Sequence, residues 1–240
     1  MKVLIVLAHH EPTSFTSALA QHGVSALRDA GHQVEFSDLY AMSFDPVSDR
    51  RNFAAVANPD RLDQQFEERA AAESTGFAPE LQAEMDKLAR CDLLVLQFPI
   101  WWLGMPAIMK GWIDRVFAIG RTYGGGRWFD QGMMAGKQAM LAVTVGGTHG
   151  AYSDQGIYGP IDAVLEPIHH GILAFCGFSV LPPFLAFAPA RKTPAERETF
   201  FKTYADRLLN VSATDHLPML LSDDYQNFIR KAAKVEVRPF

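Results

Sequence analysis

The sequence predicts an α/β fold in which helices cover both faces of a doubly wound, five-stranded parallel sheet. Short apolar runs alternate with segments whose apolar residues recur at helical spacing, which is typical of consecutive β-α-β units. The apolar runs are almost continuous, as expected of parallel strands that are buried on both faces. The 240 residues contain no internal repeat and no low-complexity linker. One domain over residues 1–210 with an extension of the same domain over residues 211–240 is therefore expected.

The first half of the chain contains three expected strands and three expected helices. The strands are expected at residues 3–8, 33–37 and 92–98, and the helices at residues 17–30, 59–74 and 80–90. Gly31 ends the first helix, and Pro79 begins the third because its fixed φ suits a first helical turn. The polar segment 38–78 is too long for a simple connection, so it is expected to lie over the surface or to cover a site.

The second half of the chain completes the predicted sheet. Helices are expected at residues 107–116, 161–175 and 194–210, and strands at residues 138–145 and 178–181, the last resuming at 184–187 after two prolines. In the extension, the pattern over residues 223–234 predicts one more helix.

Composition excludes several classes of function. The net charge of −5 gives no electrostatic reason to expect a nucleic acid or an anionic membrane surface as partner. No apolar run is long enough to cross a bilayer, and residues 1–8 are expected to form a buried strand rather than a signal peptide. The two cysteines, Cys91 and Cys176, are expected to be buried free thiols, which fits a reducing, cytoplasmic location.

Histidine pairs do not predict a metal site. His9-His10 and His169-His170 are adjacent residues whose side chains point in different directions on a strand or helix. No third ligand lies at metal-binding spacing from either pair. We therefore expect no metal.

Chemistry is expected in the loops that follow three strands. The strands at residues 3–8, 92–98 and 138–145 should end at the same edge of the sheet, where ligands bind in doubly wound folds. The loops at that edge are residues 9–16, 99–106 and 144–158.

The first of these loops carries hydroxyl side chains at the start of a helix. Thr13, Ser14, Thr16 and Ser17 together favour a phosphate site over the alternative, a simple helix cap. No G-x-G-x-x-G follows the first strand and no G-K-[ST] occurs, which argues against a Rossmann dinucleotide site and an ATPase.

The other two loops are suited to a flat, polar-edged ring. Trp101 and Trp102 lie between prolines and could form a wall for an aromatic ring, or else simply pack against the sheet. Gly146-Gly147 allow close approach of backbone donors, and Tyr152 can donate a hydrogen bond; the alternatives are a loose turn and a surface tyrosine. Together the three loops match the phosphate, ring face and pyrimidine edge of a flavin.

Ordered matches over the first three-quarters of the chain give a resemblance to a known family. They are LIVLAH at residues 4–9, TSF at 13–15, SDLYAM at 37–42, QFP at 97–99, PAI at 106–108, KGW at 110–112, GG at 146–147, YS at 152–153, QGI at 155–157, GIL at 171–173 and FCGF at 175–178. With these stretches the sequence resembles the NAD(P)H:quinone oxidoreductases of DT-diaphorase type. The resemblance implies a flavodoxin-like, flavin-binding domain over residues 1–210.

The resemblance implies a flavin enzyme that works as a homodimer with shared active sites. The implied cofactor is FAD rather than FMN, NAD(P)H is the co-substrate and a quinone is the acceptor. The implied reaction is a ping-pong transfer of a hydride from NAD(P)H to flavin N5 and then to the quinone.

The resemblance also assigns roles to individual residues. The flavin phosphate and ribityl chain would be held by His9, Thr13, Ser14, Phe15 and Thr16. The ring would lie along Pro99, Ile100, Trp101, Trp102 and Leu103, with Thr144, Val145, Gly146, Gly147 and Tyr152 at its polar edge. The catalytic residues would be Tyr152, Tyr158, Gly146 and Gly147, which would stabilise negative charge on the flavin. The substrate would contact Trp102 and Phe175, with Tyr123 and Trp128 supplied across the dimer.

Three positions depart from the family pattern. Tyr158 stands where well-studied members have a histidine, and a phenol does not become a cation at neutral pH. Glu198 aligns with an arginine near the FAD adenine, although Arg197 is adjacent. Trp101 replaces a glutamine of the animal enzymes, so substrate preference should differ.

Two alternative functions stay open at this point. One is a reductase of azo or nitro compounds from the same superfamily. The other is a flavoprotein regulatory subunit of a potassium-efflux transporter, for which segment 38–78 and the extension would offer extra surface.

Overall fold

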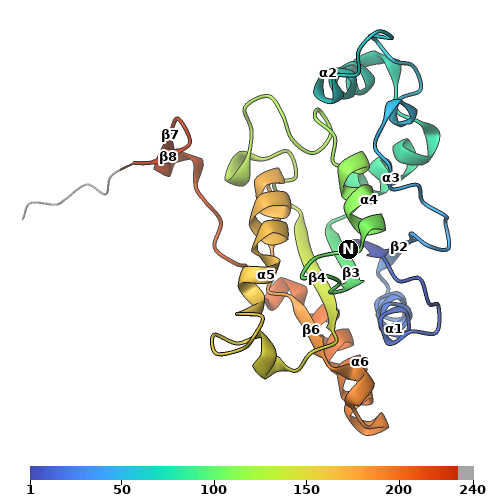
Figure 1. Cartoon of the computed structure of the whole chain (residues 1–240), viewed down its shortest axis with the longest axis vertical. Coiled ribbons are helices and arrows are strands. Elements are labelled where there is room, and N and C mark those ends of the chain that lie inside the picture. The colour runs from blue at the N-terminus through green and yellow to red at the C-terminus, as the bar shows by residue number, and fades with distance from the viewer. Residues whose placement is uncertain (232–240) are drawn as a thin grey trace, which may run out of the picture.

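The expected parallel sheet forms the centre of the molecule. A computed structural model describes residues 1–231 (Figure 1). Its strands are β1 (Lys2–Leu7), β2 (Gln33–Asp38), β3 (Leu93–Pro99), β4 (Gln138–Val145), β5 (Ser179–Val180) and β6 (Phe184–Phe187). They pair in parallel in the order β2-β1-β3-β4-β5, and β6 pairs with β4 beyond β5. The doubly wound prediction is therefore confirmed, with the fifth strand broken at the two prolines as expected.

Helices cover both faces of this sheet. They are α1 (Phe15–Asp29), α2 (Gln64–Ala70), α3 (Pro79–Arg90), α4 (Ala107–Val116), α5 (Ile161–Ile168) and α6 (Pro194–Leu209). Side chains of α1 and α6 pack with Val3 and Ile5 in one buried cluster, whereas α3, α4 and α5 pack with Leu4 and Val6 in the other. Alternate residues of β1 thus point to opposite faces, as the two-residue period of a strand requires.

Two helices differ from their predicted bounds. Helix α2 begins at Gln64 because Asp63 caps it, and its chain widens to a π-helical turn over residues 71–75. The expected helix at 161–175 is α-helical only to Ile168 and then π-helical through Ala174. Pro167 has no main-chain N–H and crowds the preceding turn, which accounts for the change of helical form.

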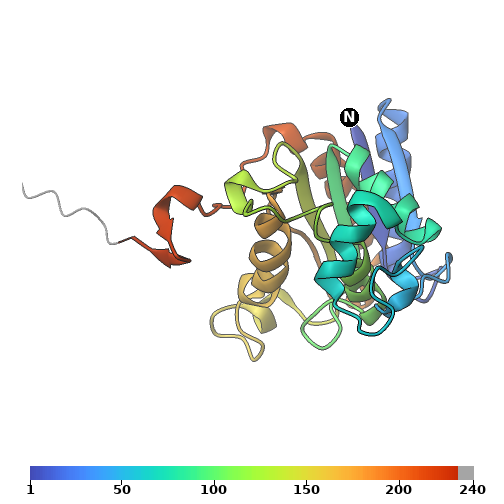
Figure 2. The ribbon, with the colours of Figure 1, turned by 90° about the horizontal axis from the view of Figure 1, so that it is seen from above.

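The helix expected at residues 223–234 is wrong for the residues that the structure describes. Residues 225–230 form a hairpin of β7 (Tyr225–Gln226) and β8 (Ile229–Arg230), and residues 232–234 lie outside the described part. Asn227 and Phe228 have φ values of 51° and 63°, which a right-handed helix does not allow. The hairpin lies away from the sheet (Figure 2).

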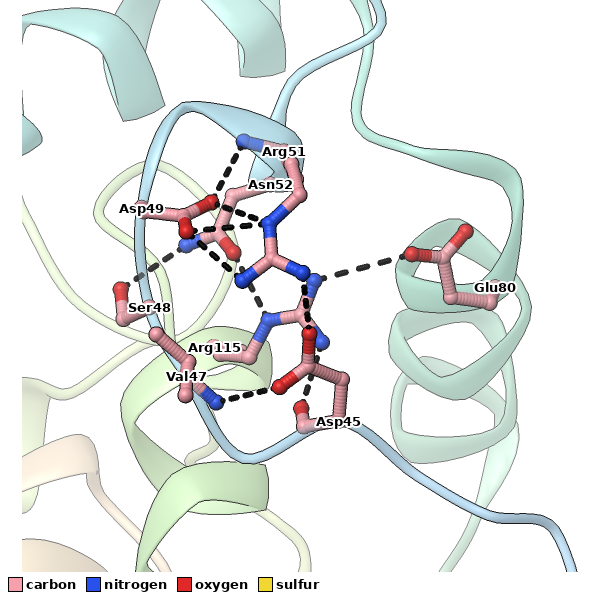
Figure 3. A network of polar contacts seen from close by, with 8 residues as sticks. All are labelled: Asp45, Val47, Ser48, Asp49, Arg51, Asn52, Glu80 and Arg115. Atoms are coloured by element: carbon pink, nitrogen blue, oxygen red, sulfur yellow. Dashed lines mark hydrogen bonds and ion pairs between the residues drawn. The ribbon is translucent and has the colours of Figure 1, made fainter.

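The long polar segment 38–78 is fastened to α4 by a buried arginine (Figure 3). The Arg115 side chain is 2% exposed, and its Nε donates to Asn52 Oδ1 at 2.7 Å. Its Nη1 donates to the Asp45 carbonyl at 2.6 Å, and its Nη2 lies 3.6 Å from Glu80 Oε1. Because a buried guanidinium needs such partners, this cluster fixes where the segment lies.

Replacing Arg115 with alanine should lower the free energy of unfolding by about 3 kcal/mol, because buried acceptors lose their donor. Arg51 is a matched control, since its side chain is 61% exposed and its ion pairs with Asp45 and Asp49 are solvated. Arg51→Ala should cost less than about 1 kcal/mol. Urea unfolding followed by circular dichroism measures both values, and equal losses would contradict this account.

His169 is a buried histidine that no hydrogen bond supports at Nε2 within the described residues. It is 5% exposed, and burial lowers its pKa to about 4. The unfolded chain takes up a proton near pH 6.5, whereas the folded chain resists it down to about pH 4. Folding stability should therefore fall as the pH drops through this window, by up to about 3 kcal/mol from this group.

The variant His169→Phe should lose that part of the pH dependence. Urea midpoints of both proteins between pH 7 and about pH 4 test this, since the ordinary histidine pKa is near 6.5. Identical pH profiles for the two proteins would show that His169 is not the responsible group.

The two cysteines are both buried and unpaired. Cys91 and Cys176 are buried free thiols, as predicted, and burial raises their pKa values to about 11 and about 12. Across residues 1–231 no helix is long and apolar enough to cross a membrane.

Candidate active site

A cleft opens where β1, β3, β4 and β6 end, at the sheet edge that the sequence indicated. Its volume is about 530 Å³, within the usual range for small-molecule sites. The residues that line it are His9, Ser14, Phe15, Thr16, Pro99, Ile100, Trp101, Thr144, Val145, Gly146, Ala188, Pro189, Ala190 and Arg197. The structure thus brings ten of the expected flavin-contacting residues to one cleft.

The first loop presents a neutral histidine to this cleft. His9 Nδ1 accepts a hydrogen bond from the Glu11 main-chain N–H at 3.0 Å. Burial and the neighbouring His10 lower the pKa of His9, so the ring is neutral near pH 7. Because Nδ1 is the acceptor, we infer that Nε2 carries the proton and can donate to a ligand.

The hydroxyl groups of this loop do not all face a ligand. Thr13 donates to Glu11 Oε1 at 2.6 Å and does not line the cleft. Ser14 lines the cleft and also caps α1, accepting from the Ser17 N–H at 3.1 Å. The helix-cap interpretation is therefore confirmed at Ser14, and the positive end of the capped helix faces the cleft. The phosphate site stays a prediction.

The tryptophan loop is a tight turn that separates its two indoles. Trp101 and Gly104 exchange two main-chain hydrogen bonds of 3.0 Å. Trp102 and Leu103 have φ values of 52° and 55°, a left-handed conformation that is costly for side chains other than glycine. Trp101 lines the cleft, whereas Trp102 is fully exposed and Leu103 is 46% exposed.

The glycine loop packs against Tyr152, which does not line the cleft. Gly146 lines the cleft, while a Cβ at Gly147 would lie 2.9 Å from the Tyr152 ring. The Tyr152 and Tyr158 ring centroids are 4.9 Å apart. The pKa of Tyr152 is raised, mainly because the phenol is buried and to a smaller extent because of the charge on Tyr158. The Tyr152 hydroxyl therefore stays protonated at neutral pH and can act as a hydrogen-bond donor.

Three residues of the cleft were not predicted, namely Ala188, Pro189 and Ala190, and Arg197 was predicted only as a neighbour of the aligned Glu198. The first three follow β6, a fourth strand that ends at the same edge, so the rule applied to three strands could have found them. Arg197, rather than the aligned Glu198, reaches the cleft; Glu198 lies 4.0 Å from Lys202.

The expected substrate-binding residues do not all gather in one cleft of a single chain. Tyr123 and Phe175, with ring centroids 5.9 Å apart, line a second cleft of about 540 Å³. Trp128 packs against Phe228 of the hairpin, with ring centroids 5.1 Å apart, and both residues line a third cleft. None of these three residues lines the cleft that contains Trp101.

The cleft fits a flat aromatic group that carries phosphate. Pro99, Ile100 and Trp101 offer an apolar face, and a Cβ at Gly146 would meet only open space within 4 Å. The first turn of α1 and the Arg197 guanidinium offer donors and positive charge for an anion.

Comparison with known sequences identifies relatives over most of the chain. A sequence model of the flavodoxin-like fold matches residues 1–210. NAD(P)H dehydrogenase (quinone) 1 of Cavia porcellus is 39% identical over 88% of this chain and 77% of its own length. Ribosyldihydronicotinamide dehydrogenase (quinone) of Homo sapiens is 37% identical over 90% of this chain and 94% of its own length.

Solved structures of quinone reductases superimpose on most of the chain. A candidate quinone reductase from Klebsiella pneumoniae is 38% identical and superimposes with a TM-score of 0.87 over 91% of this chain and 87% of its own. A quinone oxidoreductase from Methanothermobacter marburgensis, 22% identical over 90% of this chain and 99% of its own, has a TM-score of 0.71, which is a likeness of fold alone.

Proposed function

The chain belongs to the flavodoxin-like family of NAD(P)H dehydrogenases (quinone), and we propose that it reduces quinones by two electrons in a ping-pong reaction. The observation that carries the proposal is the cleft between the tryptophan turn and the glycine loop. When bound, a flavin would supply the hydride-transfer chemistry between nicotinamide and quinone, and the residues of the cleft would hold and orient it.

The phosphate end of the flavin is assigned to the first loop and α6. His9 Nε2–H, Ser14 and the N-terminus of α1 would bind one phosphate, with Phe15 and Thr16 beside the ribityl chain. Thr13, whose hydroxyl donates to Glu11, would hold the loop instead of contacting the flavin. Arg197 supplies a cation from a separate helix. This second anion-binding group favours FAD, which has two phosphates, over FMN.

The ring end is assigned to the other two loops. Pro99, Ile100 and Trp101 would stack along the ring, with Trp102 and Leu103 at its open side. Thr144, Val145, Gly146 and Gly147 would face its polar edge. Donors at the glycine backbone and at the Tyr152 hydroxyl, backed by Tyr158, would stabilise the negative charge that develops there.

A homodimer would complete the substrate site. Trp102 is fully exposed on a strained turn, which suits a side chain that is covered by a partner or a substrate. We propose that Tyr123 and Trp128 of a second copy cover it, with nicotinamide and quinone alternating between them. Because the Phe175 ring centroid lies 5.9 Å from that of Tyr123 in the same chain, we propose that Phe175 comes from the second copy as well. The buried free thiols support a cytoplasmic location.

Turnover assays test the proposed reaction. Purified protein with FAD should oxidise NADH or NADPH when a 1,4-naphthoquinone is the acceptor, and an azo dye should be reduced more slowly. Dihydronicotinamide riboside serves as a second electron donor in the assay. One relative is named as an NAD(P)H dehydrogenase and another as a ribosyldihydronicotinamide dehydrogenase. Faster turnover on the azo dye than on the quinone would assign the chain to the azo-reducing alternative.

A further inference from the structure

A fully buried chain of polar side chains runs from α6 to the cleft. The Tyr204 hydroxyl donates to Gln97 Oε1 at 2.8 Å, and Gln97 Nε2 donates to the Thr16 carbonyl at 2.9 Å. The Thr16 and Thr144 hydroxyls are 2.7 Å apart. Tyr204 and Gln97 are 0% exposed, so no solvent can substitute for these bonds.

A glycine of α1 lets α6 pack close to it. A Cβ at Gly23 would lie 2.7 Å from Tyr204 Cε1 and 2.8 Å from Leu208 Cδ1. The Phe184 ring also packs against Tyr204, with the two ring centroids 4.8 Å apart. Gly23 therefore lets α6 come close enough for its tyrosine to reach β3.

Stability alone does not account for polar groups at this place. The cluster around Tyr204 is apolar, with Val24, Leu27 and Leu208 among its members. A phenylalanine would pack there without any buried hydroxyl to satisfy. The chain of bonds instead ends on Thr16 and Thr144, two residues that line the cleft from different elements.

We infer that Tyr204 and Gln97 are positioning residues for the flavin cleft, which hold the first turn of α1 and the end of β4 at a fixed separation. Gln97 bonds the Thr16 carbonyl, and Thr16 bonds Thr144, so a shift of Gln97 moves both walls. The inference rests on the proposed binding of a flavin in this cleft.

The first test compares Tyr204→Phe with Leu208→Val, a variant in the same helix and apolar cluster that removes no polar atom. Apoprotein is titrated with FAD, and thermal midpoints are measured in parallel. Tyr204→Phe should raise the FAD Kd about tenfold, because Gln97 Oε1 loses its donor, while kcat at saturating FAD stays unchanged. Leu208→Val should lower the thermal midpoint and leave the FAD Kd within about twofold.

Two further variants guard against a general loss of structure. Gly23→Ala keeps the hydroxyl but pushes on the Tyr204 ring, and it should also raise the FAD Kd. In a double-mutant cycle, Tyr204→Phe and Thr16→Val should have less than additive effects on the Kd, since the first removes the Tyr204–Gln97 bond and the second the Thr16–Thr144 bond of the same chain.

The outcomes separate this inference from the proposed function. If the unaltered protein binds FAD and Tyr204→Phe binds it equally well, the positioning role is wrong while the flavin site stands. Equal Kd increases for Tyr204→Phe and Leu208→Val would also overturn it, as would additive effects in the cycle. If the unaltered protein binds no flavin, both the proposed function and this inference fail.

Discussion

Replacing Gly146 with valine is expected to raise the Kd for flavin about 100-fold, equivalent to about 2.7 kcal/mol. Gly146 lines the cleft, and a Cβ there would meet no atom of the chain within 4 Å. The new side chain would therefore occupy space assigned to the ring. The free energy of unfolding of the apoprotein should change by less than about 0.5 kcal/mol, since no internal contact is broken.

Gly150 provides a matched control in the same loop. A Cβ at Gly150 also meets no atom within 4 Å, but this residue does not line the cleft. Gly150→Val should therefore leave flavin affinity unchanged. Fluorescence titration of both apoproteins with FAD measures the difference, and similar affinities for the two variants would place the ring somewhere else.

Replacing Tyr152 with phenylalanine is expected to slow reduction of the bound flavin by NAD(P)H about 100-fold. This is the usual effect of removing one hydrogen-bond donor to a charge that develops in the transition state. Burial and Tyr158 raise the pKa of Tyr152, so its hydroxyl remains a neutral donor at pH 7. A Cβ on Gly147 would clash with the Tyr152 ring at 2.9 Å, which places the phenol directly against the glycine loop. Flavin affinity should change much less than the rate.

Anaerobic stopped-flow spectroscopy measures this rate directly. Tyr225→Phe is the control, because Tyr225 lies on the hairpin of β7 and β8, away from the sheet and its glycine loop (Figure 2). Its rate of flavin reduction should equal that of the unaltered protein. A Tyr152→Phe rate within about threefold of that value would remove Tyr152 from the charge-stabilising groups, since a working donor contributes far more.

The sequence predicted the sheet and the three loops because both depend on local patterns. Continuous apolar runs such as residues 93–96 can only be buried on both faces, and parallel strands must end at one edge. The helix predicted at residues 223–234 failed because its pattern gave no sign of the left-handed residues Asn227 and Phe228. A hairpin with so few neighbours is set by its turn rather than by periodicity.

The site was predicted where proximity follows from topology and missed where it follows from packing. Ser14, Trp101 and Gly146 meet because their strands are neighbours in the sheet. Arg197 arrives on a helix that returns over the opposite face from α4, and no spacing rule places its side chain. Nor could two adjacent tryptophans reveal that one lines the cleft while the other is fully exposed, since that depends on a left-handed turn.

The visible absorption spectrum of the purified protein, followed during anaerobic addition of NADPH and then of a quinone, tests the central claim most directly. We expect a bound flavin, identified as FAD after release, whose absorbance near 450 nm bleaches with NADPH and returns with the quinone. A protein that binds neither FAD nor FMN, or a bound flavin that NAD(P)H fails to bleach, would contradict the assignment of the cleft as a flavin site for quinone reduction.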